Sequence, residues 1–140
     1  MTAAPSWVVE LMEVTASDAG PTTRRVTGEL HYEVEDPLAV RLRLRRGPQD
    51  SDSWTFARDL LVDGLASPAG DGDVHVWPVP DSDTIAVECR TGEGGVIVEM
   101  AAGRVRAFLD RTVQLVPPGE EARHLRVDRM IAAILASVPR

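Results

Sequence analysis

The sequence predicts an α+β domain built on antiparallel β-sheets, with about seven strands, a short central helix and two C-terminal helices. Three observations lead to this prediction. Most of the chain alternates apolar and polar residues with the period of two that is typical of strands. The links between these stretches are short and rich in Gly, Pro and Asp, which favours antiparallel hairpins. Helical spacing appears in only three places, so no βαβ unit is required.

Three strands are predicted in the N-terminal third, at 7–14, 25–34 and 40–45. The first has three large apolar side chains on one face, namely Trp7, Val9 and Leu11. The third alternates apolar residues with a basic row, namely Arg41, Arg43 and Arg45. Asp36-Pro37 ends the second strand, because proline has no backbone N–H and keeps the residue before it out of helical angles.

One register suits both faces of a hairpin formed by the second and third of these strands. On the apolar face it pairs Val34 with Val40, Tyr32 with Leu42, and Leu30 with Leu44. On the polar face it pairs Glu33 with Arg41, His31 with Arg43, and Glu29 with Arg45. We therefore predict this register.

The stretch 53–78 contains two of the three tryptophans, and its period changes twice. Trp54 and Phe56 alternate as in a strand. A short helix follows, with apolar residues at helical spacing: Leu60, Leu61 and Leu65. Gly64 stands where a glycine can form the left-handed turn that ends a helix. The loop 67–72 is predicted to break regular structure before a strand at 74–79.

The C-terminal half is predicted to contain one hairpin and two helices. The hairpin strands are 84–91 and 95–101, joined across Gly92-Glu93-Gly94. The next helix begins at Gly103, and its apolar stripe is Val105, Phe108, Leu109 and Thr112. Asp128 is a suitable N-cap for a last helix with the apolar residues Ile131, Ile134, Leu135 and Val138.

Composition predicts a cytoplasmic protein with a single domain over residues 1–140. All 15 basic residues are arginine. Acidic residues outnumber them, and the resulting net charge of −7 disfavours non-specific nucleic-acid binding. The only cysteine, Cys89, has no partner for an internal disulfide. The N-terminus has no signal-peptide pattern, and no apolar run reaches the roughly 18–20 residues of a membrane span.

No catalytic residue, metal site or cofactor is predicted. The four candidate soft ligands fall on different elements: His31, His75, Cys89 and His124. Asp71-Gly72-Asp73 and Asp81-Ser82-Asp83 lack the rest of a calcium-binding loop and are interpreted as turns. Gly92-Glu93-Gly94-Gly95 leads into a strand, whereas a phosphate-binding loop leads into a helix.

Three groups of residues are candidates for protein interaction. Arg41, Arg43 and Arg45 form either a basic strip for an acidic partner or a solvated face that Glu29, His31 and Glu33 neutralise. Trp77, beside His75, is either an interaction hot spot or a residue covered by the C-terminal helices. The last helix is apolar on more than one stripe, which favours a homo-oligomer interface. Its candidate interface residues are Met130, Ile131, Ile134 and Leu135.

Five sequence blocks between about Val26 and Ala136 resemble the SsgA-like family of actinomycete sporulation and cell-division proteins. In chain order they are DPLAVRLRL, WTFARDLLVDGL, GDGDVHVWP, VRAFLDRTVQLVPPGEE and HLRVDRMIAAILA. The resemblance implies a non-enzymatic protein at division septa that positions the septum by localising, recruiting or promoting assembly of FtsZ. It also implies an SsgA-like paralogue as a possible partner. The implied fold is similar to that of Whirly-type proteins, with a trimeric assembly. Single-stranded nucleic-acid binding is the alternative function, because Whirly-type proteins have that activity.

Overall fold

The computed structural model describes residues 6–18, 22–45, 47–49, 51–92 and 94–125, with only the backbone of Asp71. Two helices, one 3-10 turn and eight strands lie in these ranges. The strands are β1 (Trp7–Ser17), β2 (Thr23–Glu33), β3 (Asp36–Arg45), β4 (Ser51–Ala57), β5 (Ala69–Asp71), β6 (Val74–Pro78), β7 (Thr84–Thr91) and β8 (Gly94–Ala101). The helices are α1 (Arg58–Ala66) and α2 (Ala102–Leu115), followed by η1 (Glu121–His124).

The strands form one antiparallel sheet of eight, in the order β4-β3-β2-β1-β8-β7-β6-β5. The α+β class and the antiparallel pairing are confirmed, but the strands form one sheet instead of several, and they number eight where about seven were predicted. The additional strand is β5, which the sequence placed in a loop. Its three residues pair with β6, from Ala69 opposite Val76 to Asp71 opposite Val74. Glycine weakens a strand on its own, so this pairing depends on the neighbouring strand.

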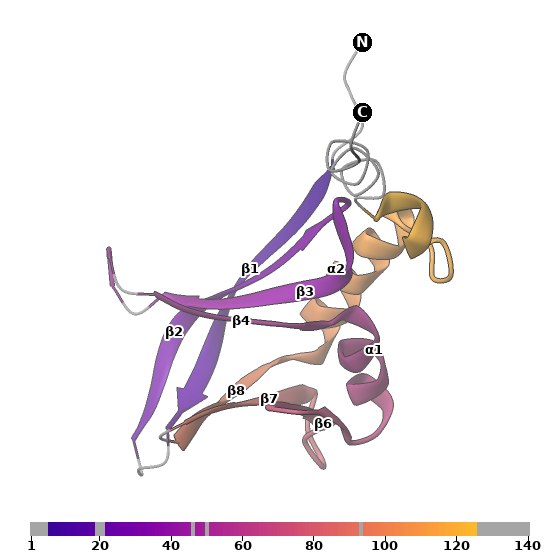
Figure 1. Ribbon diagram of the computed structural model, residues 1–140. Coiled ribbons are helices and arrows are strands. Elements are labelled where there is room, and N and C mark those ends of the chain that lie inside the picture. Colours follow the sequence, from indigo (N-terminus) through magenta and orange to yellow (C-terminus); the bar gives the residue numbers. More distant parts are fainter. Residues whose placement is uncertain (1–5, 19–21, 46, 50, 93, 126–140) are drawn as a thin grey trace.

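The sheet curls into half a barrel, and its two halves join through a narrow contact (Figure 1). Strands β1 and β8 pair only over Thr15–Ser17 and Ile97–Glu99, whereas β1 and β2 pair along their whole length. α1 packs against β5 and β6, and α2 packs against β1, β7 and β8. A single cluster of buried side chains includes residues from both halves of the sheet and from both helices, such as Leu42, Leu61, Val98 and Phe108.

β1 has apolar side chains on both faces, and the face opposite Trp7 packs into the core. Val8, Met12 and Val14 are buried, whereas Trp7 and Leu11 remain 57% and 52% exposed. Trp7, Val9 and Leu11 do share one face, as predicted, and that face points outward. The inner face accommodates Glu10 because this carboxylate forms an ion pair of 2.7 Å with Arg104 on α2.

The predicted register of the β2–β3 hairpin is wrong by two residues. Leu30 lies opposite Leu42, and Gly28 lies opposite Leu44. On the outer face, Glu29 lies opposite Arg43, His31 opposite Arg41, and Glu33 opposite Asp36.

The turn explains this slip. It consists of Val34 and Glu35 and lies ahead of the Asp36-Pro37 pair where the sequence placed it. The ladder then shifts between His31 and Glu33, so β3 accommodates extra residues near Pro37. The Tyr32 hydroxyl donates a hydrogen bond of 2.8 Å to the Pro37 carbonyl at this irregularity. Because the slip is an even number of residues, every side chain keeps its predicted face.

Gly64 does not end α1, contrary to the prediction. The helix continues to Ala66, where the Ser67 N–H bonds to the Asp63 carbonyl at 3.1 Å. Gly64 is buried inside the helix, and a Cβ there would collide with the side chain of Val76 on β6. The glycine is therefore needed for close helix–strand packing, which no local pattern reveals.

The rest of the C-terminal half agrees with the sequence wherever it is described. Strands β7 and β8 form the predicted hairpin, and the predicted stripe of α2 is buried. The two acidic tripeptides lie at turns, where Gly72 and Asp81 have positive φ angles of 61° and 56°. The predicted last helix, with the interface candidates Met130, Ile131, Ile134 and Leu135, lies outside the described residues.

Candidate interaction surface

The three arginines of the predicted basic row lie on the outer face of β3. They alternate with the buried residues Val40, Leu42 and Leu44, so the strand period alone directs Arg41, Arg43 and Arg45 away from the core. All three are exposed. β3 is the second strand from one end of the sheet, and the row therefore lies between β2 and the edge strand β4.

Acidic side chains of β1 and β2 pair with only part of the basic charge on this face. Glu29 forms an ion pair of 3.5 Å with Arg45, and Glu13 forms one of 3.5 Å with Arg25. Within the described ranges, no carboxylate lies within 4 Å of the guanidinium of Arg41 or Arg43. Arg41 and Arg43 are thus without a direct ion pair in the described residues, although Glu33 and Asp36 also lie on this face.

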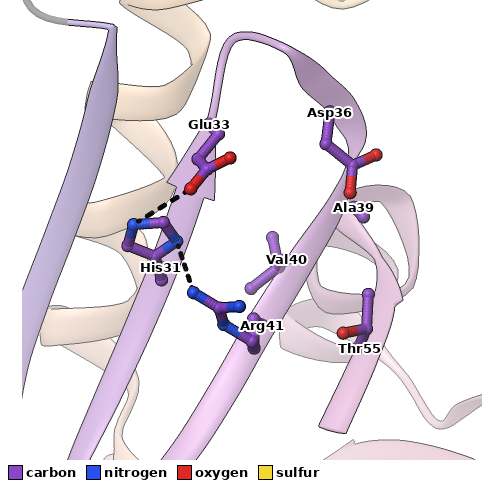
Figure 2. A pocket seen from close by; sticks show the side chains of 7 residues that line it. All are labelled: His31, Glu33, Asp36, Ala39, Val40, Arg41 and Thr55. Atoms are coloured by element: carbon purple, nitrogen blue, oxygen red, sulfur yellow. Dashed lines mark hydrogen bonds and ion pairs between the residues drawn. The ribbon is translucent and has the colours of Figure 1, made fainter.

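His31 connects Arg41 to Glu33. The Arg41 guanidinium donates to Nδ1 of His31 at 3.4 Å, and Nε2 lies 3.7 Å from the Glu33 carboxylate. Because arginine only donates, this contact requires that Nδ1 accept the hydrogen bond. Figure 2 shows this chain of side chains crossing from β2 to β3.

A small hollow of about 70 Å³ opens beside His31, at the place where the β2–β3 ladder shifts (Figure 2). Its lining comes from β2, β3 and β4: His31, Glu33, Asp36, Ala39, Val40, Arg41 and Thr55. This space suits a few water molecules or one small polar group. Charges of both signs line it, so it can accept a polar side chain of a partner more readily than a large ligand.

Two exposed apolar side chains border the charged face. Trp7 lies opposite Glu33 and Leu11 lies opposite Glu29, so both share the outer face with β2. Exposed apolar side chains that share one face and are rimmed by polar groups occur at protein contact surfaces, where Trp is enriched among the residues that contribute most to binding. The sequence showed that they share a face but did not show that this face is outside.

Trp77 and His75 lie far from the arginine row along the sheet. They are on β6, and four strands separate β6 from β3. Both side chains are partly buried; Trp77 lies opposite Ala86 and His75 opposite Glu88. They line a separate depression with residues of β5. The two predicted groups therefore do not form one site, and both alternatives for Trp77 stay predictions.

A buried arginine at the start of α1 is the main feature that sequence reasoning missed. Arg58 is only 3% exposed. Its guanidinium donates to the carbonyls of Thr112 and Val116 at 3.2 and 2.8 Å, and to the Glu121 carboxylate at 2.9 Å. It also lies 5.1 Å from the centre of the Tyr32 ring. A cation at a helix N-terminus is unfavourable, because it opposes the helix dipole. This position is the one local signal that Arg58 has a tertiary partner.

Arg58 and its partners connect four elements: α1, the end of α2, η1 and β2. Glu121 also accepts the Gly119 N–H at 2.8 Å. A hydrogen bond from its own backbone, and then the one from Arg58, lower the pKa of Glu121 from its ordinary value. Burial raises the pKa of Tyr32, despite the nearby Arg58. We refer to Tyr32, Arg58, Thr112, Val116 and Glu121 as the Arg58 cluster.

Other groups that bear on chemistry are few in the described part of the chain. Cys89 is fully buried, and burial raises the pKa of its thiol to about 12, so it stays protonated at neutral pH. No three His, Cys, Asp or Glu side chains of the described ranges gather as a metal site needs. Nor does any helix found in these ranges have the length and apolarity to cross a membrane.

The sequence matches known proteins over most of its length. The family model described as "Streptomyces sporulation and cell division protein, SsgA" matches residues 26–121. The sporulation-specific cell division protein SsgB of Streptomyces coelicolor is 39% identical over 113 residues, covering 79% of this chain and 82% of that one. SsgB of Kineococcus radiotolerans is 42% identical over 115 residues, covering 79% and 69%.

Solved structures agree with this match. A structure described as "Mutations in SsgB correlate to longitudinal cell division during sporulation of Streptomyces coelicolor" superposes with a TM-score of 0.77 at 34% identity, covering 85% of this chain and 95% of that one. An SsgA-like sporulation-specific cell division protein from Thermobifida fusca gives 0.82 at 27% identity, covering 95% and 98%. The family that the sequence blocks suggested is confirmed: this chain belongs to the SsgA family of sporulation and cell-division proteins, and its relatives include SsgB.

Proposed function

We propose that this protein positions the division septum by localising, recruiting or promoting assembly of FtsZ, without catalysing a reaction. Family membership is the observation that carries the proposal, because the matched family and relatives are described as sporulation and cell division proteins. The FtsZ step extends this from the family resemblance. An outer sheet face with exposed Trp7 and Leu11 is consistent with a protein that works by binding another protein.

The proposed mechanism is display of several copies of one weak binding surface by a homo-oligomer, which we propose to be a trimer at the septum. Simultaneous contacts with a polymer raise the apparent affinity by roughly 10²-fold or more over one contact. An SsgA-like paralogue is a further proposed partner. Such a protein needs no pocket or reactive group.

Sedimentation with FtsZ polymers tests the proposal. The purified protein is expected to pellet with FtsZ in the presence of GTP, or to change the light scattering of the polymers, either alone or with a paralogue. A fluorescent fusion is expected to form rings at future septa in sporulating cells. A diffuse fusion together with no effect on FtsZ in either mixture would refute the proposal.

The alternative is single-stranded nucleic-acid binding by a Whirly-like protein, and it has less support. Glutamates lie between and beside the arginines of the outer face, as the Glu29–Arg45 pair shows, and they would repel a phosphate backbone. A mobility shift at low salt that disappears steeply with added salt would favour this alternative.

A further inference from the structure

The outer face of β1, β2 and β3 combines two exposed apolar side chains with two arginines that, among the described residues, have no carboxylate within ion-pair distance. We refer to Trp7, Leu11, Arg41 and Arg43 as the outer binding face. The strand pairings fix its geometry: Leu11, Glu29 and Arg43 form one row across three strands, and Val9, His31 and Arg41 form the next. Neighbouring strands are about 4.8 Å apart, so Leu11 and Arg43 lie roughly 10 Å apart.

The outer face has charges of both signs, and only some of them are paired. The chain has a net charge of −7. Glu13 and Glu29 of this face pair with Arg25 and Arg45, each at 3.5 Å, which partly offsets their charge. Glu33 and Asp36 lie near Arg41, whereas Arg43 has no carboxylate of the described residues within ion-pair distance, so the positive potential of the face is centred on Arg43. A guanidinium without a neighbouring carboxylate attracts the carboxylate of a partner and repels its cations.

We propose that the outer binding face holds an acidic segment of a partner protein that also carries a large apolar side chain. The apolar side chain rests on Trp7 and Leu11, and carboxylates meet Arg41 and Arg43. In an extended segment three residues cover roughly 10 Å, so an apolar residue and an acidic residue about three positions apart match both groups. This inference deepens the proposed function. It rests on that function only for the statement that the partner acts in cell division.

A peptide fits this face better than a nucleic acid does. Glu33 is about half exposed and Asp36 is exposed, and both line the hollow next to Arg41. A continuous phosphate backbone over Arg41 would pass these carboxylates and be repelled, whereas a short segment with one or two acids avoids them. The hollow beside His31 leaves space for a polar side chain of the segment.

The test uses a fluorescein-labelled peptide with the apolar-to-acidic spacing given above, Gly-Ser-Trp-Gly-Ser-Asp-Asp-Gly, repeated in tandem and titrated with the full-length protein. Control peptides replace Trp with Ser, or both Asp with Asn. Fluorescence anisotropy is expected to show binding of the first peptide only. Added salt is expected to weaken it, because the charges are at the surface. Because FtsZ is absent, this result does not depend on the proposed function.

Paired variants locate the binding. Arg41→Gln with Arg43→Gln is expected to reduce peptide affinity about tenfold, and Trp7→Ser with Leu11→Ser by at least as much. The matched control for charge is Arg106→Gln with Arg123→Gln, two exposed arginines outside this face. The matched control for apolar surface is Val62→Ser, because Val62 is an exposed apolar residue on α1. Both controls are expected to bind as the unaltered protein does.

Several outcomes would overturn the inference. One is that no peptide binds, or that the control variants weaken binding as much as the variants of the outer face. Another is that Trp7→Ser with Leu11→Ser changes the oligomeric state in light scattering, which would make this face a contact between copies of the chain. A third is that labelled single-stranded DNA binds through Arg41 and Arg43 when the peptide does not. If the peptide binds as expected and FtsZ does not, only the proposed function fails.

Discussion

The Arg58 cluster and the outer binding face both contain arginine and an aromatic residue, in opposite surroundings. Arg58 is buried, and its guanidinium donates to two carbonyls and to Glu121. Arg41 and Arg43 are exposed and have no carboxylate of the described chain within ion-pair distance. A buried cation must have all its hydrogen bonds inside the protein, whereas an exposed one can offer them to a partner. The first cluster therefore serves stability, and the second face is available for binding.

The largest expected difference in the free energy of unfolding comes from removing an arginine charge in each of the two regions. Arg58→Met should lower the free energy of unfolding by about 3 kcal/mol, because it leaves Glu121 and two carbonyls without their donor. Arg41→Met, the same change on the outer face, should alter it by less than about 0.5 kcal/mol. Urea denaturation of both variants measures this. Equal losses of stability would mean that the buried Arg58 contributes no more to stability than the exposed Arg41 does.

The two faces of β1 allow the same comparison with apolar residues. Met12→Ala should lower the free energy of unfolding by about 2 kcal/mol, since Met12 is buried in the core. Trp7→Ser should change it by no more than about 0.5 kcal/mol, because the larger part of the indole is already in water. Thermal and urea unfolding provide the measurement. A larger loss from Trp7→Ser would show that its face is covered in the intact protein.

Gly64 tests how closely α1 packs against β6 in the buried part of the molecule. Alanine is a better helix former than glycine by about 1 kcal/mol, so Gly64→Ala should stabilise a free helix. Here the new Cβ meets Val76, and we expect a net loss of about 1.5 kcal/mol in the free energy of unfolding. The double variant, Gly64→Ala with Val76→Ala, should lose less free energy of unfolding than the sum of the losses of the two single variants. Strict additivity would disprove the contact.

Acid should weaken the Arg58 cluster through Glu121, with the smallest of these effects. The folded-state pKa of Glu121 is lowered from its ordinary value of 4.5. The carboxylate therefore contributes stability above that ordinary pKa, and the contribution is lost as the pH falls through the lower folded value. Glu121→Gln should make the free energy of unfolding less dependent on pH in the acid range. Urea denaturation of both proteins between pH 7 and pH 3 compares the slopes, and identical slopes would contradict the ion pair.

Local patterns predicted the elements that depend on neighbours in sequence. The β7–β8 hairpin and the buried stripe of α2 follow from spacing alone, and both are confirmed. The β2–β3 register was missed because the even slip satisfies the same apolar alternation, and only the turn at Val34-Glu35 distinguishes the two registers. β5 was missed because Gly70 and Pro68 read as a loop until β6 lies beside them.

The candidate site was less accessible from sequence than the fold was. The arginines of β3 were placed on a common face, since strand period determines that, but their neighbours depend on the register. Trp7 and Leu11 were grouped correctly, yet β1 is apolar on both sides, so its pattern did not identify the outer one. Arg58 and Glu121 are 63 positions apart, a separation at which no periodicity indicates a contact.

The sequence by itself determined the α+β class, the two antiparallel hairpins β2–β3 and β7–β8, which side chains share a face of a strand, and the family, because each depends on residue types at short spacing. Only the tertiary structure decided which face of β1 is buried, which residues of β2 and β3 are partners, and which arginine is enclosed. These depend on how the sheet curls and where α1, α2 and η1 pack onto it. The physical reason is that burial and charge pairing arise between segments distant in sequence, where a local pattern contains no information.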